Sequence, residues 1–424
     1  MPPHTYYHAT ATEPFPNAPE LTEPITADVC VIGGGYAGLS AALHLARKGA
    51  SVALLEESRI GDGASGRNGG QVHNGFRHDS HWFESRLGAD FARQIGLLGI
   101  EARDHLDWLI RTYNIDAQYL PGLLHLCHKR SYVAETRAHV EDVLSRHPEA
   151  GLRFVDQEEA RSLVNSNAYY GGYLDPHSGH LHALNLALGI ARAAQQHGAR
   201  LYELSKVSGV ARAASGWEVR TRTGSVRASN VVLAGNGYLR DLQPAVEARV
   251  MPINNFVVTT EPLGREAAER LIRDRRAVSD SRFVVNYFRI TPDDRLLFGG
   301  GETYTYQIPQ DIAGVVRPHI LRIFPQLKDT RIEHAWAGTV AITMARLPFV
   351  REIEPGFFNA SGFSGQGIVI APFAGKALAD AIDGDRRVFH LLEQFPVRRF
   401  PGGKLLRWPV LVAAMSWYAL RDHL

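Results

Sequence analysis

Hydrophobic and polar positions near the start of the chain predict a strand, a helix and a second strand in succession. Residues 27–32 form a short apolar run rich in β-branched side chains, which is typical of a buried parallel strand. Small and apolar residues then recur at helical spacing over 39–46. A second apolar run at 51–55 predicts the next strand. The pattern therefore predicts a β-α-β unit over residues 27–55.

Glycines occupy the turn between the first strand and the helix, where a dinucleotide would bind. Gly33, Gly35 and Gly38 form G-x-G-x-x-G between the first strand and the helix, with Tyr36 and Ala37 inside it, and Glu56 ends the second strand. Such glycines allow a tight turn, a close approach to a pyrophosphate and close packing of helix on strand. The helix N-terminus favours an anion, and the acid can accept hydrogen bonds from a ribose. We expect a dinucleotide cofactor here.

A second glycine-rich stretch, GDGASGRNGG at 61–70, follows directly. A flexible surface loop is the plain alternative, but an NAD enzyme has no general need for a second glycine cluster at this place. A flavin has an extended body and a flat ring, which bare backbone can pass closely, so the stretch favours FAD. The candidate cofactor residues here are Ser65, Gly66, Arg67, Asn68, Gly69, Gly70 and Gln71, with Arg67, Asn68 and Gln71 as polar anchors.

Distant segments are expected to complete the cofactor site. Residues 357–382 predict a strand, a GFSGQG loop and a helix whose N-terminal dipole faces the flavin. The strand within 230–239 ends at Gly235 and Asn236, and Val207 offers backbone to an adenine. The candidates from the GFSGQG segment are Gly362, Ser364, Gly365, Gln366, Gly367 and Ile368.

Composition narrows the functional class. The 424 residues are 45% hydrophobic and 21% charged with a net charge of +2, so neither nucleic acid nor a membrane surface is an expected partner. We expect a cytoplasmic protein, because the start lacks a signal-peptide pattern and no stretch is long and apolar enough for a transmembrane span. The apolar segment 408–420 is expected to pack on the body or on a subunit. His177, His180 and His182 lack an acid or thiol partner, so no metal site is predicted.

The chain resembles the D-amino acid oxidase and glycine oxidase superfamily of FAD-dependent amine oxidoreductases. The resemblance rests on DVCVIGGGYAGLSAALHLA, RIGDGASGRNGGQ, HLHALNLA, YELSKV, NYFRITPDDRLLFGGG and FPQLKDTRIEHAWAG, which span almost the whole sequence. Within the superfamily it is strongest to the enzymes that oxidise gamma-glutamylated polyamines. It implies oxidation of a primary amine to an aldehyde and ammonia, with FAD bound non-covalently and oxygen as the electron acceptor.

The resemblance also implies the fold class: α/β, with a Rossmann-like FAD-binding domain of the glutathione-reductase type and a substrate domain built on an antiparallel sheet. Residues 1–26 would form an N-terminal extension and 386–424 a C-terminal tail. The FAD-binding domain would take 27–89, 174–249 and 331–385, and the substrate domain 90–173 and 250–330.

The chemistry belongs to the flavin, so no general base is nominated. Candidates for the substrate pocket are Trp336, Phe363, Gln366, Tyr287 and Arg289, with Arg289 for a glutamyl carboxylate. The family's loop commonly reads GYSGHG, so Phe363 and Gln366 are departures close to the expected flavin face. A lysine that assists oxygen in sarcosine-type oxidases has no counterpart in RLLFGGG at 295–301. An FAD amine or amino-acid dehydrogenase that passes electrons to a quinone therefore stays open as the alternative.

Overall fold

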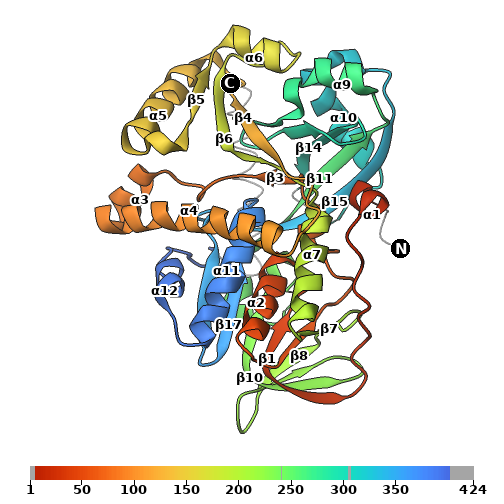
Figure 1. Cartoon of the computed structure of the whole chain (residues 1–424), viewed down its shortest axis with the longest axis vertical. Helices are drawn as coiled ribbons and strands as arrows, with labels where there is room; N and C mark the ends of the chain where they lie inside the picture. The colour runs from red at the N-terminus through yellow and green to blue at the C-terminus, as the bar shows by residue number, and fades with distance from the viewer. Residues whose placement is uncertain (1–4, 240, 304–306, 402–424) are drawn as a thin grey trace.

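Two β-sheets organise the chain in this computed structural model, which describes residues 5–239, 241–303 and 307–401 (Figure 1). The apolar segment 408–420 lies outside these residues. The first sheet fills the lower half of the view, and the second lies above it.

The first sheet is mainly parallel, as the predicted β-α-β unit requires. Its strand order is β16 (Phe349–Glu354), β17 (Phe357–Ser361), β10 (Ser225–Leu233), β1 (Pro24–Ile32), β2 (Val52–Leu55) and β7 (Arg200–Tyr202). β8 (Gly209–Arg212) and β9 (Trp217–Arg220) extend β10 as an antiparallel layer. All four residues of β2 are buried, because a parallel strand covered on both faces must be apolar throughout. The carboxyl ends of β1, β2 and β10 therefore meet at one edge.

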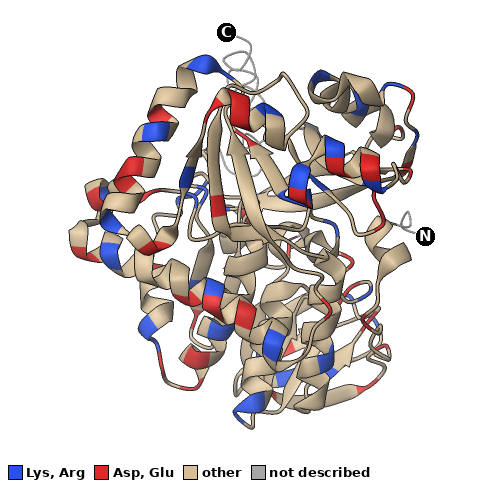
Figure 2. Cartoon of the chain, turned by 45° about the horizontal axis from the view of Figure 1, so that its top comes forward, with Lys and Arg blue, Asp and Glu red and all other residues tan. Residues whose placement is uncertain are grey.

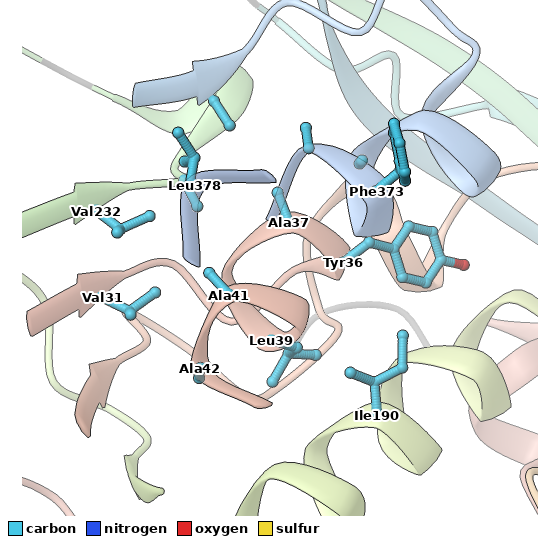
Figure 3. Packing of buried hydrophobic residues seen from close by; sticks show 14 of the residues in the cluster. Val31, Tyr36, Ala37, Leu39, Ala41, Ala42, Ile190, Val232, Phe373 and Leu378 are labelled. Atoms are coloured by element: carbon cyan, nitrogen blue, oxygen red, sulfur yellow. The ribbon is translucent and has the colours of Figure 1, made fainter. Parts of the chain in front are cut away.

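Two helices, α2 (Tyr36–Arg47) and α11 (Gly367–Ile382), pack against this sheet, and α7 (Ala183–Gln196) packs against α2 (Figure 1). Residues 36–46 of α2 are all buried, which explains why this helix is apolar or small on every side. A side chain at Gly375 of α11 would lie 2.2 Å from the carbonyl oxygen of Ala37 in α2, so the two helices touch backbone to backbone. Figure 3 shows Val31 and Val232 of the sheet in one buried layer with side chains of both helices.

The second sheet is mixed and mainly antiparallel. Its strand order is β15 (Ile332–Ile342), β11 (Met251–Thr260), β14 (Leu296–Thr303), β13 (Tyr287–Ile290), β12 (Ala277–Asp280), β4 (Leu120–Leu126), β6 (Gly172–His180) and β3 (Gln71–Val72), and β5 (Arg153–Val155) pairs with β6. β12 and β4 form its parallel pair. Phe288, Phe298 and Phe324 lie in a separate apolar core on this sheet, so each sheet has its own core.

The remaining helices lie around the two sheets. They are α1 (Tyr6–Thr10), α3 (Ser80–Leu87), α4 (Ala89–Thr112), α5 (Val133–Arg146), α6 (Gln157–Leu163), α8 (Pro244–Glu247), α9 (Arg265–Leu271), α10 (Ile312–Ile323) and α12 (Arg387–Glu393). Basic and acidic residues alternate along the outer helices (Figure 2). No helix in the described part of the chain combines the length and the hydropathy that a membrane crossing requires.

Sheet membership departs from the predicted domain ranges at three strands. β3, β6 and β15 lie wholly or mostly within the ranges assigned to FAD binding, yet they pair in the second sheet. The long helix α4, assigned to the substrate domain, contacts α11 beside the first sheet. The chain therefore crosses between the sheets more often than the motif positions alone indicate.

Candidate functional site

One cavity of about 1770 Å³ opens between the two sheets. We call its lower part the cradle, which is lined by 33–37, 55–58, 62–65, 67–69, 206–207, 234–236 and 363–368. We call its upper part the arm, which is lined by 73–80, Arg103, Tyr119, His125, Tyr173, Asp175, Asn255, 279–283, Tyr287 and Arg346. The cradle and the arm are continuous, so a ligand in one can meet a ligand in the other.

The fingerprint glycines shape the bottom of the cradle. Gly33 has φ +111°, and a side chain there would lie 2.8 Å from the carbonyl oxygen of Ala234 on the neighbouring strand. A side chain at Gly38 would lie 2.0 Å from the carbonyl oxygen of Gly33, so this glycine allows the helix to pack on the turn. Gly33, Gly35, Tyr36 and Ala37 line the cavity and Gly38 does not. These positions match the roles expected from the spacing.

Glu56, at the end of β2, holds the turn in place. Its Oε2 accepts a hydrogen bond from the Gly34 N–H at 2.7 Å, and its Oε1 accepts one from the Ser58 N–H at 2.8 Å. Burial raises the pKa of this carboxyl, and the two backbone donors partly oppose that rise. Each oxygen keeps a second lone pair, so Glu56 can still accept hydrogen bonds from a sugar hydroxyl.

The glycine-rich stretch 61–70 is tied to itself by side chains. Asn68 donates from Nδ2 to the carbonyl oxygens of Ala64 and Ser65, and its Oδ1 accepts from the Gly70 N–H at 2.8 Å. Arg67 donates from Nε to the carbonyl oxygen of Asp62 at 2.6 Å. Arg67 and Asn68 therefore hold the loop together, and Asn68 Nδ2 also lies 3.5 Å from the Tyr36 hydroxyl outside it.

The glycines of this stretch divide into two groups. Gly63 and Gly69 line the cavity, whereas Gly61, Gly66 and Gly70 do not. Side chains at Gly66 and Gly70 would lie 2.4 and 2.2 Å from the carbonyl oxygens of Gly61 and Leu181. Most of these glycines thus allow the loop to pack, and fewer leave bare backbone for a cofactor than the sequence led us to expect.

Two helix N-termini, those of α2 and α11, open into the cradle. The N-cap residue of α2 is Gly35 and that of α11 is Gln366, and neither makes a side-chain capping bond. Ser65 Oγ accepts a hydrogen bond from the Tyr36 N–H at 3.0 Å, which leaves other N–H groups of the first turn of α2 available. Free N–H groups and the helix dipole favour an anion, so the cradle fits the pyrophosphate of a dinucleotide.

Most residues predicted from the distant segments line the cradle in this structure. Gly235, Asn236 and Val207 line it, together with Ser364, Gly365, Gln366, Gly367 and Ile368. Asn236 Oδ1 accepts a hydrogen bond from the Gly362 N–H at 3.0 Å and so joins β10 to the loop before α11. Gly362 itself lies outside the lining. Gln71 donates from Nε2 to the carbonyl oxygen of Val278, while its Oε1 is buried without a partner.

The five residues predicted for the substrate pocket fall into two groups, those that line the cavity and those that do not. Tyr287, Phe363 and Gln366 line the cavity. The Tyr287 hydroxyl donates to Asn255 Oδ1 at 2.5 Å, and a side chain at Gly69 would lie 2.2 Å from the Tyr287 ring. The Tyr287 ring therefore stands where the cradle and the arm meet.

Trp336 and Arg289 do not line the cavity, which corrects the prediction for both. Trp336 is fully buried, and its indole N–H donates to the carbonyl oxygen of Arg67 at 2.9 Å. Arg289 is 2% exposed and donates to the carbonyl oxygens of Gly69 and Leu181 and to the Tyr7 hydroxyl. Both side chains donate hydrogen bonds to backbone carbonyl oxygens of the glycine-rich stretch without lining the cavity.

The arm contains polar residues that the sequence patterns missed. Arg77 and Arg346 line it, and so do His73 and His125. Burial lowers the pKa of each of these two histidines to about 4, so both imidazoles are neutral near pH 7. His73 and Arg77 follow β3 closely in the sequence, and that proximity to the glycine-rich stretch is the one signal that pointed to them.

The three histidines considered for a metal have separate partners. His177 Nε2 contacts the carbonyl oxygen of Glu149, and His180 Nε2 that of Arg275. His182 Nδ1 accepts from the Asn185 N–H at the start of α7. Among the residues with described positions, no group of three or more His, Cys, Asp or Glu side chains is arranged to share a metal ion.

Comparison with known proteins agrees with this geometry. The family described as FAD dependent oxidoreductase matches residues 28–381. The probable oxidoreductase OrdL of Rhizobium meliloti is 40% identical over 422 residues, covering 100% of this chain and 98% of its own length. The gamma-glutamylputrescine oxidoreductase of Escherichia coli is 39% identical over 429 residues, covering 100% of both chains.

The fold is also similar to that of solved enzymes. Glycine oxidase from Geobacillus kaustophilus superposes with a TM-score of 0.71 at 22% identity, covering 84% of this chain and 95% of that one. L-proline dehydrogenase from P. horikoshii superposes with a TM-score of 0.68 at 23% identity, covering 86% and 94%. The arrangement of the two sheets therefore belongs to a fold that flavoenzymes of this kind use.

Proposed function

Because the chain belongs to the family of FAD-dependent oxidoreductases, we propose that it oxidises the primary amine of a gamma-glutamylated polyamine of the gamma-glutamylputrescine type. The products would be the aldehyde and ammonia, with oxygen as the final electron acceptor and hydrogen peroxide as its product. The observation that carries the proposal is the continuity of the cradle with a long polar arm. Full-length similarity to an enzyme of that name supports it.

The cofactor is FAD, which the cradle fits through its two helix N-termini and its bare glycine backbone. When bound, FAD supplies the acceptor for the hydride from the amine carbon. Neither cysteine lines the cavity, because Cys30 is buried in β1 and Cys127 is buried beside Thr136. The FAD is therefore held without a covalent bond to cysteine.

The residues of the chain bind and orient the amine. Tyr287 and Phe363 offer aromatic surface that packs on an alkyl chain and keeps water away from the reacting carbon. The bond from Tyr287 to Asn255 fixes the angle of that ring. Hydride transfer needs an uncharged amine, and the neutral imidazoles of His73 and His125 add no positive charge beside it. We nominate no catalytic base, since the amine reacts once it is deprotonated.

The visible spectrum of the purified protein tests the proposal. We expect a flavin spectrum that bleaches when gamma-glutamylputrescine is added without air and returns rapidly when air is admitted. A matched titration with putrescine controls for reaction of any primary amine.

Each other outcome has a definite meaning. Bleaching without recovery in air would replace oxygen by another acceptor and favour the dehydrogenase. A spectrum that gamma-glutamylputrescine does not change would refute the substrate, while a colourless protein that does not take up added FAD would refute the cofactor assignment.

A further inference from the structure

The arginines of the cavity fall into two classes. Arg103 pairs with Asp107, Arg282 with Asp280 and Arg146 with Asp142. Arg67, in the cradle, donates to the carbonyl oxygen of Asp62. Arg77 and Arg346 line the arm, and neither has a carboxylate partner among the residues that the structure describes. Arg77 is exposed and Arg346 is half-buried, and both line the cavity. Two guanidinium groups without a carboxylate partner make this part of the cavity wall positive, and an anion bound there would neutralise that charge.

Two acids that line the arm, Asp175 and Asp79, bond to other groups. Asp175 accepts hydrogen bonds from the Asn74 side chain, from the N–H groups of His177 and Ser178 and from the Ser178 hydroxyl. Asp79 caps α3 by accepting from the Trp82 N–H. These bonds hold both carboxylates in place, so neither supplies the missing partner.

The two arginines come from loops that are bound to each other. A ring nitrogen of His78 lies 2.7 Å from the carbonyl oxygen of Ala345, which joins the segment after β3 to the segment after β15. Arg346 lies over the Phe283 ring, with its guanidinium carbon 5.0 Å from the ring centre. Desolvation lowers the pKa of the Arg77 guanidinium, and the charge on Arg346 lowers it further. The two charges thus repel each other.

We propose that Arg77 and Arg346 form the subsite that binds the carboxylate of the gamma-glutamyl group. The guanidinium plane matches a carboxylate with two parallel hydrogen bonds, and a bound anion relieves the repulsion between the two cations. This subsite takes the role that the sequence gave to Arg289. The proposal rests on the proposed function for the identity of the substrate, although the anion site itself does not depend on turnover.

A pair of substrates that differ in one group tests the subsite. N-glutarylputrescine ends in a carboxylate, and N-pentanoylputrescine has a methyl group in the same place. The rate of flavin reduction per unit of substrate is measured for both without air. For the unaltered protein we expect a preference of about ten- to a hundredfold for the glutaryl compound, the range typical of a charged hydrogen bond.

Three variants show whether the two arginines cause the preference for the glutaryl compound. R77M and R346M should each reduce it towards one, and R77K should retain part of it because lysine keeps the charge but not the planar fork. R146M is the matched control, since it removes an arginine from the cavity wall that already has an acid partner, and it should leave the preference unchanged. Flavin content and thermal unfolding are measured for every variant to identify any that fold poorly.

A second readout is independent of catalysis. N-butylglutaramate carries the carboxylate but no amine, and its binding is followed by the change it causes in the flavin spectrum. Weaker binding in R77M and R346M but not in R146M supports the subsite even if no amine reduces the flavin. Equal binding in all four proteins, or an undiminished substrate preference in both arginine variants, overturns it.

Discussion

The cradle and the arm are two ends of one cavity, but they are built from different parts of the chain. The cradle consists largely of backbone: glycines, helix N-termini and strand ends, with Glu56 and Asn68 bonded to main-chain groups. The arm consists of side chains such as Arg77, His125 and Tyr287, from strands and loops far apart in the sequence. A site built from backbone rarely tolerates an added side-chain atom. A site built from side chains changes its preference among ligands when one side chain changes.

This difference predicts that a small addition in the cradle does more harm than the loss of a larger group in the arm. G38A adds one carbon, which would lie 2.0 Å from the carbonyl oxygen of Gly33. Alanine favours a helix, but that gain of about 1 kcal/mol is smaller than the cost of a backbone clash. We expect about 3 kcal/mol of lost stability and no retained flavin.

G209A is the control, because nothing lies within 4 Å of the added carbon in β8. Urea unfolding and the ratio of flavin to protein absorbance measure both effects. A yellow G38A protein of normal stability would show that the packing of α2 on the turn is not what limits the cradle.

Arg289 belongs to the cradle by its contacts, although it was predicted for the arm. R289M leaves the carbonyl oxygens of Gly69 and Leu181 without their donor. We expect a loss of about 2 kcal/mol in flavin affinity, with little change in the Michaelis constant for the amine. R295M, whose side chain pairs with Asp293 and Glu333, should leave flavin affinity intact. An increase in the Michaelis constant of R289M at full flavin occupancy would return this residue to the arm.

The contrast explains what the sequence predicted. The β-α-β unit, the fingerprint and the GFSGQG loop were found because each role depends on a glycine or an acid at a fixed local spacing. The strands β1, β2 and β17 begin and end within a few residues of the expected positions. In contrast, β3, β6 and β15 pair with strands distant in the chain, and no local pattern shows which sheet a strand joins.

The residues that line the arm were harder to predict, because the direction of a side chain on its strand does not reveal whether another segment covers it. Tyr287 and Arg289 are two residues apart on β13 and point to the same face. Tyr287 is open to the cavity, while the loop at Gly69 and Gly70 covers Arg289. Trp336 is likewise covered by Arg67. The packing of a loop distant in the sequence therefore determines which of these side chains reach the cavity.

The arm should also respond to acid. His73 and His125 have pKa values of about 4 in the folded protein, below the ordinary value of 6.5. The unfolded chain therefore binds more protons between these values, so their contribution to stability is complete above pH 6.5 and is lost as the pH falls towards 4. Each histidine should lower the free energy of unfolding by up to about 1.4 kcal/mol per pH unit in that window.

Urea unfolding at pH 7 and at pH 5.5 measures this loss. H73Q/H125Q should show a smaller difference between the two pH values than the unaltered protein. H147Q is the control, since His147 is an exposed residue at the outer end of the cavity. An unchanged pH dependence in the double variant would show that other groups take up the protons.

The smallest expected effect is that of a change at Tyr287, where the cradle and the arm meet. Y287F keeps the aromatic ring but removes the hydroxyl that donates to Asn255. We expect full flavin content and a change of about 1 kcal/mol in the rate of flavin reduction, because one neutral hydrogen bond is lost. Y202F, on β7 away from the cavity, is the matched control for the loss of a hydroxyl. If Y287F lost flavin instead, Tyr287 would be part of the cradle, and the boundary between a backbone site and a side-chain site would lie beyond this ring.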